Sequence, residues 1–439
     1  MKTVKRQPAA VGKAGRDARP QRISVIGLGY IGLPTAAVFA SRGIEVIGVD
    51  TNAGAVETIN QGRIHIVEPD LDMVVQAATF QGKLRATLVP EPADAFLIAV
   101  PTPFKDEHEP DLSHIQAVAK AIAPVLKAGN LVVLESTSPV GATEKLADWL
   151  AAARTDLTFP QQAGEASDIR IAYCPERVLP GHILRELVAN DRVIGGMTPR
   201  CSEAAAALYR TFVSGECVIS DARTAEMCKL TENAFRDVNI AFANELSLIC
   251  DKLGVSVWEL IALANRHPRV NILQPGAGVG GHCIAVDPWF IVSQTPDEAR
   301  LIHTARQVND HKPHWVTGKV MAAVNEVAVE KGIKAGEVKV AAFGLTFKPN
   351  IDDMRQSPAL EIVGNLAPFF PHGIWAVDPY IDELPADLAA KGVTLVPMAQ
   401  AYDTADVLVL LVDHRQFIEN QPERRAGTRT IDTRGIWRS

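Results

Sequence analysis

The amino-acid sequence predicts an α/β protein in which two Rossmann-like, doubly wound domains are joined by a central all-helical region. Three observations support this fold class: strand-like and helix-like runs alternate in the first half, helical periodicity alone fills the middle, and the strand rhythm returns in the last third. We expect domains over residues 21–215, 216–330 and 331–439. A basic tail over 1–20 precedes them; it lacks the apolar segment of a secretory signal, and we expect it to be disordered.

The composition is that of a soluble globular protein. Hydrophobic residues make up 47% of the 439 and charged residues 22%, and no apolar run approaches the roughly 18 residues of a membrane-spanning helix. The net charge of -7, with no concentrated basic stretch beyond the tail, disfavours nucleic acid as a partner. The six cysteines show no metal-ligand spacing and are too sparse for a disulfide scaffold. We expect reduced thiols, no metal, a cytoplasmic location and a small-molecule ligand.

The first domain begins with a βαβ unit. From Arg22, the sequence ISVIGLGYIGLPTAAVFASRGIEVIGVD gives a β-branched run, a glycine-rich turn, an Ala-rich helical stretch and a second β-branched run. Further strand-like runs occur at 95–101, 130–137 and 169–176, with helical patterns between them. This alternation predicts a parallel, doubly wound sheet.

Gly27, Gly29 and Gly32 form a GxGxxG turn between the first strand and the first helix, which is the context that dinucleotide binding requires. These glycines permit a tight turn, close approach of the backbone to a pyrophosphate, and close helix packing. Asp50 ends the next strand, where its carboxylate can accept hydrogen bonds from ribose hydroxyls. Because no arginine follows Asp50, a 2′-phosphate would meet a negative charge alone, and the sequence favours NAD over NADP.

Five further residues are expected to contact the cofactor. Tyr30 and Ile31 lie inside the turn, and Thr102, Thr137 and Thr143 follow strand-like runs at the sheet edge where open α/β proteins bind ligands. A glycine-rich turn that binds nothing is the alternative for the motif. For each threonine, N-capping or turn formation is an equally good alternative.

The middle of the chain is predicted to be helical. Residues 221–254 keep apolar positions at helical spacing, contain no proline and stop at Gly254, which predicts one long helix. Residues 255–267 predict a second helix, and 298–332 predict a third that Pro313 should bend or break. Because a helical middle of this kind often forms a dimer interface, we expect a homodimer.

The last region repeats the strand rhythm at 338–347, 373–379, 406–413 and 428–436. This pattern predicts a second nucleotide-binding fold, but the region has no GxGxxG motif. We therefore do not expect its ligand to bind through the same pyrophosphate turn.

Cys283 differs from the other cysteines in its surroundings. It follows four glycines in PGAGVGGHCIAVDP, residues 275–288, and Asp287 stands four residues after it. Cys228 and Cys250 fall inside the long predicted helix, where a cysteine is usually a small buried apolar residue. Glycines let backbone wrap closely round a ligand, so a thiol on this loop could reach a carbonyl carbon. Beside a nicotinamide, such a thiol can carry an aldehyde through a thiohemiacetal and a thioester to an acid.

Four segments together carry a resemblance to a known family. In chain order they are the GxGxxG turn, AEMCKLTENAF, PGAGVGGHCIAVDP and FGLTFKPNIDDMRQSPA. They are similar to the UDP-glucose/GDP-mannose dehydrogenase family, and the resemblance covers everything beyond the tail. It implies two successive oxidations of a nucleotide sugar at C6, to a carboxylate, with two NAD+ reduced.

The resemblance implies four catalytic residues. Cys283 would be the covalent nucleophile, and Lys229 an acid/base or oxyanion-stabilising group. Asp287 would orient Lys229 or a water, and Glu176 would assist thioester hydrolysis. The base that accepts the proton in the first oxidation is Lys229, Asp287 or a water, and the sequence does not distinguish them. Lys229 has the alternative of an exposed helix lysine in a salt bridge, and Glu176 that of a strand-end ion pair.

The resemblance also implies contacts to substrate and cofactor. Lys229, Asn233 and Arg236 follow one another at helical spacing and share a polar face that suits a sugar. The other positions implied for substrate contact are Arg177, Val178, His267, Arg269, Gly280, Phe347, Lys348 and Arg434, the last in its own or in a neighbouring subunit. Arg355 would contact NAD. His267 has the alternative of a simple loop hydrogen bond.

Four segments narrow the substrate that the resemblance implies. CPERVLPG, KLTENAFRDVNIAFANELS, NRHPRVNILQPG and GHCIAVDPWF are most similar to members that oxidise UDP-N-acetyl-D-mannosamine to its uronate for bacterial surface polysaccharide. UDP-N-acetylglucosamine and UDP-glucose are the alternatives within the family, since such differences change binding by only about 1–3 kcal/mol. Outside the family, the alternatives are a single-step dehydrogenase of the 6-phosphogluconate or hydroxyacid kind and a catalytically inactive NAD-binding scaffold.

Overall fold

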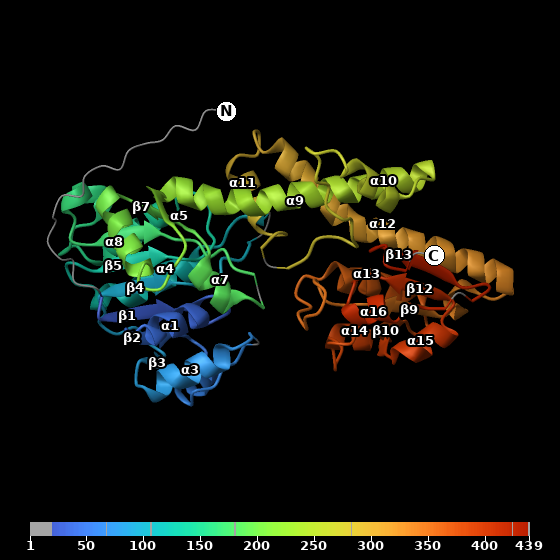
Figure 1. Cartoon of the computed structure of the whole chain (residues 1–439), viewed down its shortest axis with the longest axis horizontal. Helices are drawn as coiled ribbons and strands as arrows, with labels where there is room; N and C mark the ends of the chain where they lie inside the picture. The colour runs from blue at the N-terminus through green and yellow to red at the C-terminus, as the bar shows by residue number, and fades with distance from the viewer. Residues whose placement is uncertain are drawn as a thin grey trace. The chain divides into compact units, whose positions relative to one another are not determined.

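The computed structural model describes residues 20–66, 68–105, 108–179, 181–281, 283–423 and 425–437. The expected tail over 1–20 lies outside the described residues except for Pro20. The chain divides into two compact units, which are described separately (Figure 1). Unit 1 extends to Thr102 and resumes over Leu112–Glu226, and unit 2 comprises Pro103–Asp111 and Met227–Ser439.

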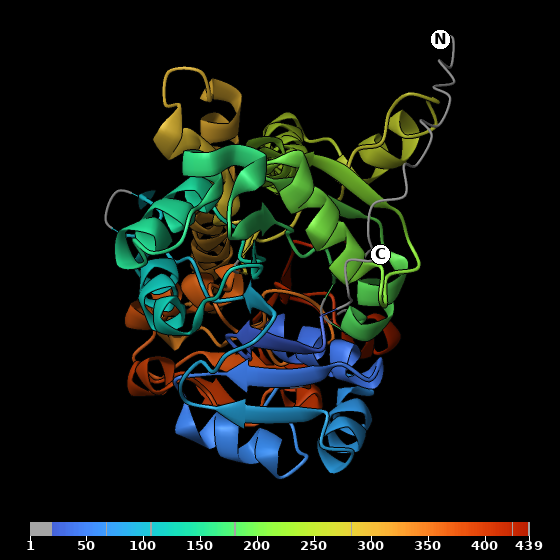
Figure 2. The same ribbon diagram turned by 90° about the vertical axis from the view of Figure 1, so that its left-hand side faces the viewer.

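Unit 1 is built on an eight-stranded sheet, whose first strands are the blue arrows in Figure 2. The strand order is β3-β2-β1-β4-β5-β6-β7-β8. The strands are β1 (Arg22–Ile26), β2 (Glu45–Val49), β3 (Leu84–Thr87), β4 (Ala95–Ile98), β5 (Leu131–Leu134), β6 (Arg170–Tyr173), β7 (Arg192–Gly196) and β8 (Cys217–Asp221). Pairing is parallel from β3 to β6, but β7 pairs antiparallel with β6. The prediction of an entirely parallel sheet is wrong at this edge, because an antiparallel neighbour needs no crossover back to the opposite end of the sheet.

Helices cover both faces of this sheet, so the doubly wound architecture is confirmed. They are α1 (Gly32–Ser41), α2 (Ala53–Asn60), α3 (Leu71–Phe80), α4 (Ser113–Ile122), α5 (Ala142–Ala153), α6 (Pro160–Ala163), α7 (Ile183–Ala189) and α8 (Pro199–Tyr209). In β1, Ile23 and Val25 belong to one apolar cluster and Ile26 belongs to another. Every residue of β4 is buried, as the apolar runs of parallel strands require.

The three helices predicted for the middle of the chain are present. They are α9 (Ala222–Leu253), whose first turn belongs to unit 1, α10 (Val257–Ala264) and α12 (Arg300–Lys331). A short helix that was not predicted, α11 (Asp287–Gln294), lies between α10 and α12. Gly254 ends α9 with a φ of +69°, as its sequence position predicts. The alternative of a break at Pro313 is wrong, because α12 continues through this buried proline. The part of the helix from Val316 to Ala328 packs into the apolar core of unit 2. None of the described helices is long and apolar enough to cross a membrane.

Unit 2 also contains the second predicted sheet, which is parallel throughout with the order β11-β10-β9-β12-β13. Its strands are β9 (Val340–Phe343), β10 (Trp375–Val377), β11 (Thr394–Leu395), β12 (Val407–Leu410) and β13 (Arg429–Asp432). The helices beside it are α13 (Pro358–Leu366), α14 (Ala386–Ala390), α15 (Met398–Thr404) and α16 (Arg415–Glu419). This order repeats the first five strands of unit 1, so the second Rossmann-like fold is confirmed.

Candidate active site

The GxGxxG turn joins β1 to α1 in a geometry that suits a pyrophosphate. A Cβ atom at Gly32 would lie 1.7 Å from the carbonyl oxygen of Gly27, and one at Gly27 would lie 2.5 Å from the carbonyl oxygen of Ala99. At Gly29, by contrast, a Cβ would meet no atom within 4 Å, so this glycine leaves open space beside the turn. Because α1 begins without a side-chain cap or an acidic residue in its first turn, its positive end favours an anion.

Asp50 fixes the turn from the neighbouring strand. Its Oδ2 accepts a hydrogen bond from the backbone N–H of Leu28 at 2.9 Å, and its Oδ1 accepts one from the N–H of Asn52 at 2.8 Å. Each carboxylate oxygen has a further lone pair that a ribose hydroxyl can use. Tyr30 and Ile31 lie partly buried within the turn. The residues of this turn therefore fit NAD.

The three threonines make contacts within unit 1. The Thr102 hydroxyl donates to the carbonyl oxygen of Thr137. Thr143 is fully buried, and its hydroxyl donates to Glu226 at 2.6 Å. The same carboxylate accepts the N–H of Gly141, which ties the start of α5 to the start of α9. These hydrogen bonds correspond to the turn formation and N-capping that were the alternatives for the threonines. The expected contacts of the threonines with the cofactor stay predictions.

Glu176, Arg177 and Val178 follow β6 in unit 1. Glu176 forms a buried ion pair with Arg192 at 3.0 Å and accepts the backbone N–H of Arg177 at 2.7 Å. The Arg177 side chain donates to the carbonyl oxygen of Asp191 at 3.2 Å, and Val178 packs against the apolar core. The ion pair that was the structural alternative for Glu176 is thus formed, and a part in hydrolysis stays a prediction.

Unit 2 brings three of the predicted residues together with Cys283. Lys229 and Asn233 lie one turn apart on α9, and Asp287 is the first residue of α11. The Asn233 side-chain amide donates to Oδ2 of Asp287 at 2.5 Å. The N–H of Asp287 donates to the carbonyl oxygen of Cys283 at 2.9 Å, so one turn carries both thiol and carboxylate. Lys229 acts electrostatically on both groups.

The protein surroundings set the charges of this cluster. Asp287 is 3% exposed, and burial raises the pKa of its carboxyl to about 6, against the lowering effects of Asn233 and Lys229. The Cys283 side chain is exposed, yet nearby protein displaces enough water to raise the pKa of the thiol. The Asp287 charge raises this pKa further, and the charges of Lys229 and Arg355 lower it. The thiol therefore needs a proton acceptor before it can attack a carbonyl carbon.

The glycines ahead of Cys283 pack against the loop that follows β9. A Cβ at Gly280 would lie 2.4 Å from the carbonyl oxygen of Gln356, and one at Gly281 would lie 2.9 Å from the Phe347 ring. We expected these glycines to let the backbone wrap closely round a ligand, but packing within unit 2 already requires them. Their packing brings Phe347 to the segment of Cys283.

The predicted arginines of the last region are held by carboxylates. Arg355 forms a two-point contact with Asp353, in which Nη2 lies 2.6 Å from Oδ2. Arg434 pairs with Asp413 at 2.8 Å and donates to the carbonyl oxygen of Pro275 at 3.3 Å. Arg434 therefore contacts the beginning of the glycine-rich segment of its own chain.

Three predicted substrate residues lie on the surface of unit 2. Arg236 on α9 and both His267 and Arg269 after α10 are exposed, whereas Lys348 is partly buried in the loop after β9. The N–H of Arg269 donates to Nδ1 of His267 at 3.4 Å, which is the loop hydrogen bond considered as the alternative. This bond is local to the loop after α10.

Sequence reasoning missed the residues that hold this site in place. Asn244 on α9 accepts the N–H of Gly276 at 3.0 Å and donates to Asn309 of α12 at 2.9 Å, which anchors the start of the glycine-rich segment. Asp378 and His414 brace the loop after β9. Only Asp378 carried a sequence signal, because VDP after its strand repeats the VD that ends the second strand of unit 1.

Fold and site together define a class of protein. A dinucleotide turn in one Rossmann-like unit, and a thiol beside a lysine and a carboxylate in a unit with a second such sheet, are the parts of an NAD-dependent dehydrogenase. Models of the UDP-glucose/GDP-mannose dehydrogenase family match the chain as an NAD binding domain over residues 21–213, a central domain over 223–311 and a UDP binding domain over 341–439. The chain belongs to this family, which confirms the resemblance.

Individual relatives match nearly the whole chain. It is 66% identical over 415 residues to NDP-N-acetyl-D-galactosaminuronic acid dehydrogenase of Ralstonia nicotianae, covering 94% of this chain and 96% of the relative. It is 65% identical over 418 residues to UDP-N-acetyl-D-mannosamine dehydrogenase of Yersinia pestis, covering 95% and 99%. The solved structure of UDP-D-ManNAc dehydrogenase from Pyrococcus horikoshii matches with a TM-score of 0.83 at 39% identity, over 94% of this chain and 96% of that chain.

Proposed function

We propose that this enzyme oxidises UDP-N-acetyl-D-mannosamine at C6 to UDP-N-acetyl-D-mannosaminuronate, for bacterial surface polysaccharide. One UDP-sugar, two NAD+ and one water give the carboxylate, two NADH and three protons. The grouping of Cys283, Lys229, Asn233 and Asp287 in unit 2 carries the proposal, because a thiol is what takes the reaction beyond the aldehyde. The 65% identity to the Yersinia pestis enzyme supports this sugar. We place the reaction in the cytoplasm, where thiols stay reduced.

NAD+ at the GxGxxG turn supplies the hydride acceptor for both oxidations. In the first oxidation, Lys229, Asp287 or a water accepts the proton of the C6 hydroxyl as the aldehyde forms. The sulfur of Cys283 then bonds to C6, and the thiol proton ends on the former carbonyl oxygen. Loss of a hydride from C6 and of that hydroxyl proton leaves a thioester on Cys283. Water attacks the thioester carbon, the carbon–sulfur bond breaks, and the thiol is regenerated with the free carboxylate.

The remaining predicted residues have binding or supporting roles in this proposal. Glu176 assists the attack of water on the thioester. The substrate contacts are Arg177, Val178, Lys229, Asn233, Arg236, His267, Arg269, Gly280, Phe347, Lys348 and Arg434, and the cofactor contacts include Arg355. Arginine suits the phosphates because its planar guanidinium donates two parallel hydrogen bonds.

The second candidate substrate is the N-acetylgalactosamine epimer. The 66% identity to the Ralstonia nicotianae enzyme, whose name specifies a galactosaminuronic acid, favours it. Epimers differ in the direction of one hydroxyl or acetamido group, so discrimination depends on the shape of the sugar pocket. Family membership disfavours the single-step hydroxyacid-type dehydrogenase.

Steady-state kinetics across UDP-sugars decides between these substrates. We expect the highest kcat/KM with UDP-N-acetyl-D-mannosamine, compared with the N-acetylgalactosamine, N-acetylglucosamine and glucose derivatives. A preference for the galactosamine derivative would transfer the proposal to the second candidate. A preference for UDP-glucose would contradict both, and NAD binding without turnover of any sugar would revive the inactive scaffold.

We also propose that α9 forms the interface of a homodimer. Phe235, Phe242 and Ile249 recur at intervals of seven on α9 and are 69%, 51% and 46% exposed, and Leu253 is 70% exposed. A second copy of the same helix is the natural partner, because its stripe is complementary to itself. We expect sedimentation to give a dimer for the wild type and a monomer for Phe242→Asp. A wild-type monomer at micromolar concentration would contradict the proposal.

A further inference from the structure

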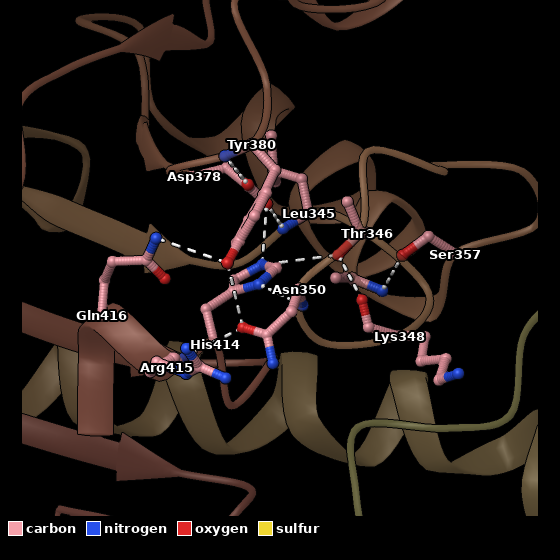
Figure 3. A network of polar contacts seen from close by, with 11 residues as sticks. Leu345, Thr346, Lys348, Asn350, Ser357, Asp378, Tyr380, His414, Arg415 and Gln416 are labelled. Carbon is pink, nitrogen blue, oxygen red and sulfur yellow. Dashed lines mark hydrogen bonds and ion pairs between the residues drawn. The ribbon is translucent and has the colours of Figure 1, made fainter. Parts of the chain in front are cut away.

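The loop after β9 is held by a buried histidine that the proposed mechanism does not use. His414 lies just beyond β12, and Asp378 follows β10; both side chains are fully buried. Nε2 of His414 lies 3.2 Å from Oδ2 of Asp378 (Figure 3). Because β10 and β12 flank β9 on its two sides, these residues meet across the end of the central strand.

The hydrogen bonds determine which nitrogen of His414 carries the proton. The N–H of Asn350 donates to Nδ1 at 3.0 Å, so Nδ1 is an acceptor. The Thr346 hydroxyl donates its single hydrogen to the carbonyl oxygen of Lys348 at 2.8 Å. It can therefore only accept from Nε2, which lies 3.4 Å away. Nε2 bears the proton and directs it to Asp378 and Thr346, so both ring nitrogens are engaged within the protein.

Asn350, midway along the loop between β9 and α13, is held through both its backbone and its side chain. Besides its bond to His414, its Oδ1 accepts the N–H of Arg415 at 2.9 Å and the hydroxyl of Tyr380 at 3.2 Å (Figure 3). Its φ of +63° lies in the left-handed region, which asparagine adopts more readily than most residues. Three hydrogen bonds thus hold Asn350 in this conformation, although the residue is exposed.

The loop held in this way carries two residues expected to contact the substrate. The Phe347 ring packs against Gly281 of the Cys283 segment, and the N–H of Phe347 donates to the carbonyl oxygen of Asp353 at 3.1 Å. Lys348 follows in the same loop. The stretch 341–439 that includes the loop matches the UDP binding domain of the family. A displacement of the loop would therefore act on the UDP half of the substrate.

We propose that His414 is a positioning residue for UDP-sugar binding, acting through Asn350 and Thr346 to fix the loop that presents Phe347 and Lys348. The inference rests on the proposed function, because it assumes that this loop contacts the UDP-sugar. His414 touches no reacting atom. Its loss changes the affinity for UDP and leaves NAD binding in unit 1 as it is.

The test compares four variants of the full chain. Each is measured for the KM of UDP-N-acetyl-D-mannosamine and of NAD, for the Kd of UDP by calorimetry, and for its thermal midpoint. We expect His414→Ala to raise the KM of the sugar and the Kd of UDP about tenfold, with the KM of NAD within about twofold of wild type. His414→Gln supplies a donor and an acceptor and should restore most of the affinity.

Two further variants separate positioning from stability. Val409→Ala truncates a fully buried residue of β12 outside the network, so it should lower the thermal midpoint and leave the affinities unchanged. Tyr380→Phe removes one hydrogen bond to Asn350 and should weaken UDP binding about two- to threefold.

The inference is overturned if His414→Ala lowers the midpoint but changes neither the KM of the sugar nor the Kd of UDP. If His414→Ala does not fold, unchanged UDP affinity in Tyr380→Phe overturns it instead. Wild-type enzyme that binds UDP but turns over no UDP-sugar would count against the proposed function alone, because the calorimetric comparison needs no turnover.

Discussion

The two Rossmann-like sheets have the same backbone hydrogen bonds at the end of their central strands, β1 and β9. The residues that surround these bonds differ between the two units. In unit 1, the N–H of Gly27 bonds to Val49 at 2.8 Å, and Asp50 accepts the N–H of Leu28 at 2.9 Å. In unit 2, the N–H of Gly344 bonds to Val377 at 2.8 Å, and Asp378 accepts the N–H of Leu345 at 2.7 Å. Gly27 and Gly344 share a φ of +90°.

The difference lies beyond these shared bonds. The turn of unit 1 continues to Gly29, where no atom lies within 4 Å of a Cβ, and so leaves room for a cofactor. The loop of unit 2 continues to Thr346, and the space across the strand ends is filled by His414 and its partners. The same strand order thus leaves room for a dinucleotide in unit 1 and holds a loop in place in unit 2. Asp50 and Asp378 thus occupy equivalent positions, and we propose that they serve different ligands. Four predictions test this difference.

The largest effect is expected at Cys283, which belongs to unit 2 alone. Cys283→Ser should lower acid formation by about 10³-fold or more, because a hydroxyl is a far poorer nucleophile and leaving group than a thiol. NAD binding should stay as in the wild type. Product analysis by mass spectrometry and a fluorescence titration with NAD measure the two effects. Cys250→Ala, at a buried cysteine of α9, is the matched control, and acid formation at the wild-type rate in Cys283→Ser would refute the nucleophile.

The open space at Gly29 should be the point where unit 1 is most sensitive. Gly29→Val places a side chain where the pyrophosphate is expected, and it should raise the KM of NAD about 100-fold without a loss of stability. UDP binding should not change. Gly32→Ala is the contrasting variant, because its Cβ would lie 1.7 Å from a backbone oxygen and the fold itself must shift. If Gly29→Val has the same KM for NAD as the wild type, NAD does not bind against this turn.

The equivalent aspartates give a matched pair. Asp50→Asn should raise the KM of NAD about tenfold, because an amide cannot accept both backbone N–H groups and the ribose hydroxyls. Asp378→Asn should weaken UDP binding instead, since it disturbs the bond from His414. Paired KM measurements check both variants. If both substitutions change the same KM, Asp50 and Asp378 do not act on different ligands, and the proposed difference between the two sheets is wrong.

The smallest expected effect is a shift in pH dependence within unit 2. The buried Asp287 has a pKa of about 6, so as the pH falls through this value its carboxylate is protonated and kcat/KM should decrease. Asn233→Ala removes a hydrogen bond that lowers this pKa, so the inflection should move to higher pH. Profiles of kcat/KM against pH measure the shift, and Asp287→Asn should abolish the inflection. An unmoved inflection in Asn233→Ala would assign it to another group.

Much of the fold could be predicted because it depends on local signals. The run of strands, the GxGxxG turn and the stop of α9 at Gly254 are encoded by periodicity and by glycine conformation. The antiparallel edge at β7 could not be predicted, because it depends on tertiary packing. The helix over 298–332 was predicted, but local signals could not decide whether it bends or breaks at Pro313. The bond from Asn233 to Asp287 depends on how α9 meets α11, which no spacing reveals. His414 gave no signal, since a lone histidine after a strand acquires its role only from Asp378 and Asn350.

The most direct test counts the NADH formed for each UDP-N-acetyl-D-mannosamine consumed and examines the Cys283 peptide after rapid acid quench. We expect two NADH for each sugar, a uronate as the product, and a sugar-derived adduct on Cys283 that decays as the uronate appears. One NADH for each sugar, with an aldehyde as the final product and no adduct on Cys283, would contradict a thiol-mediated double oxidation.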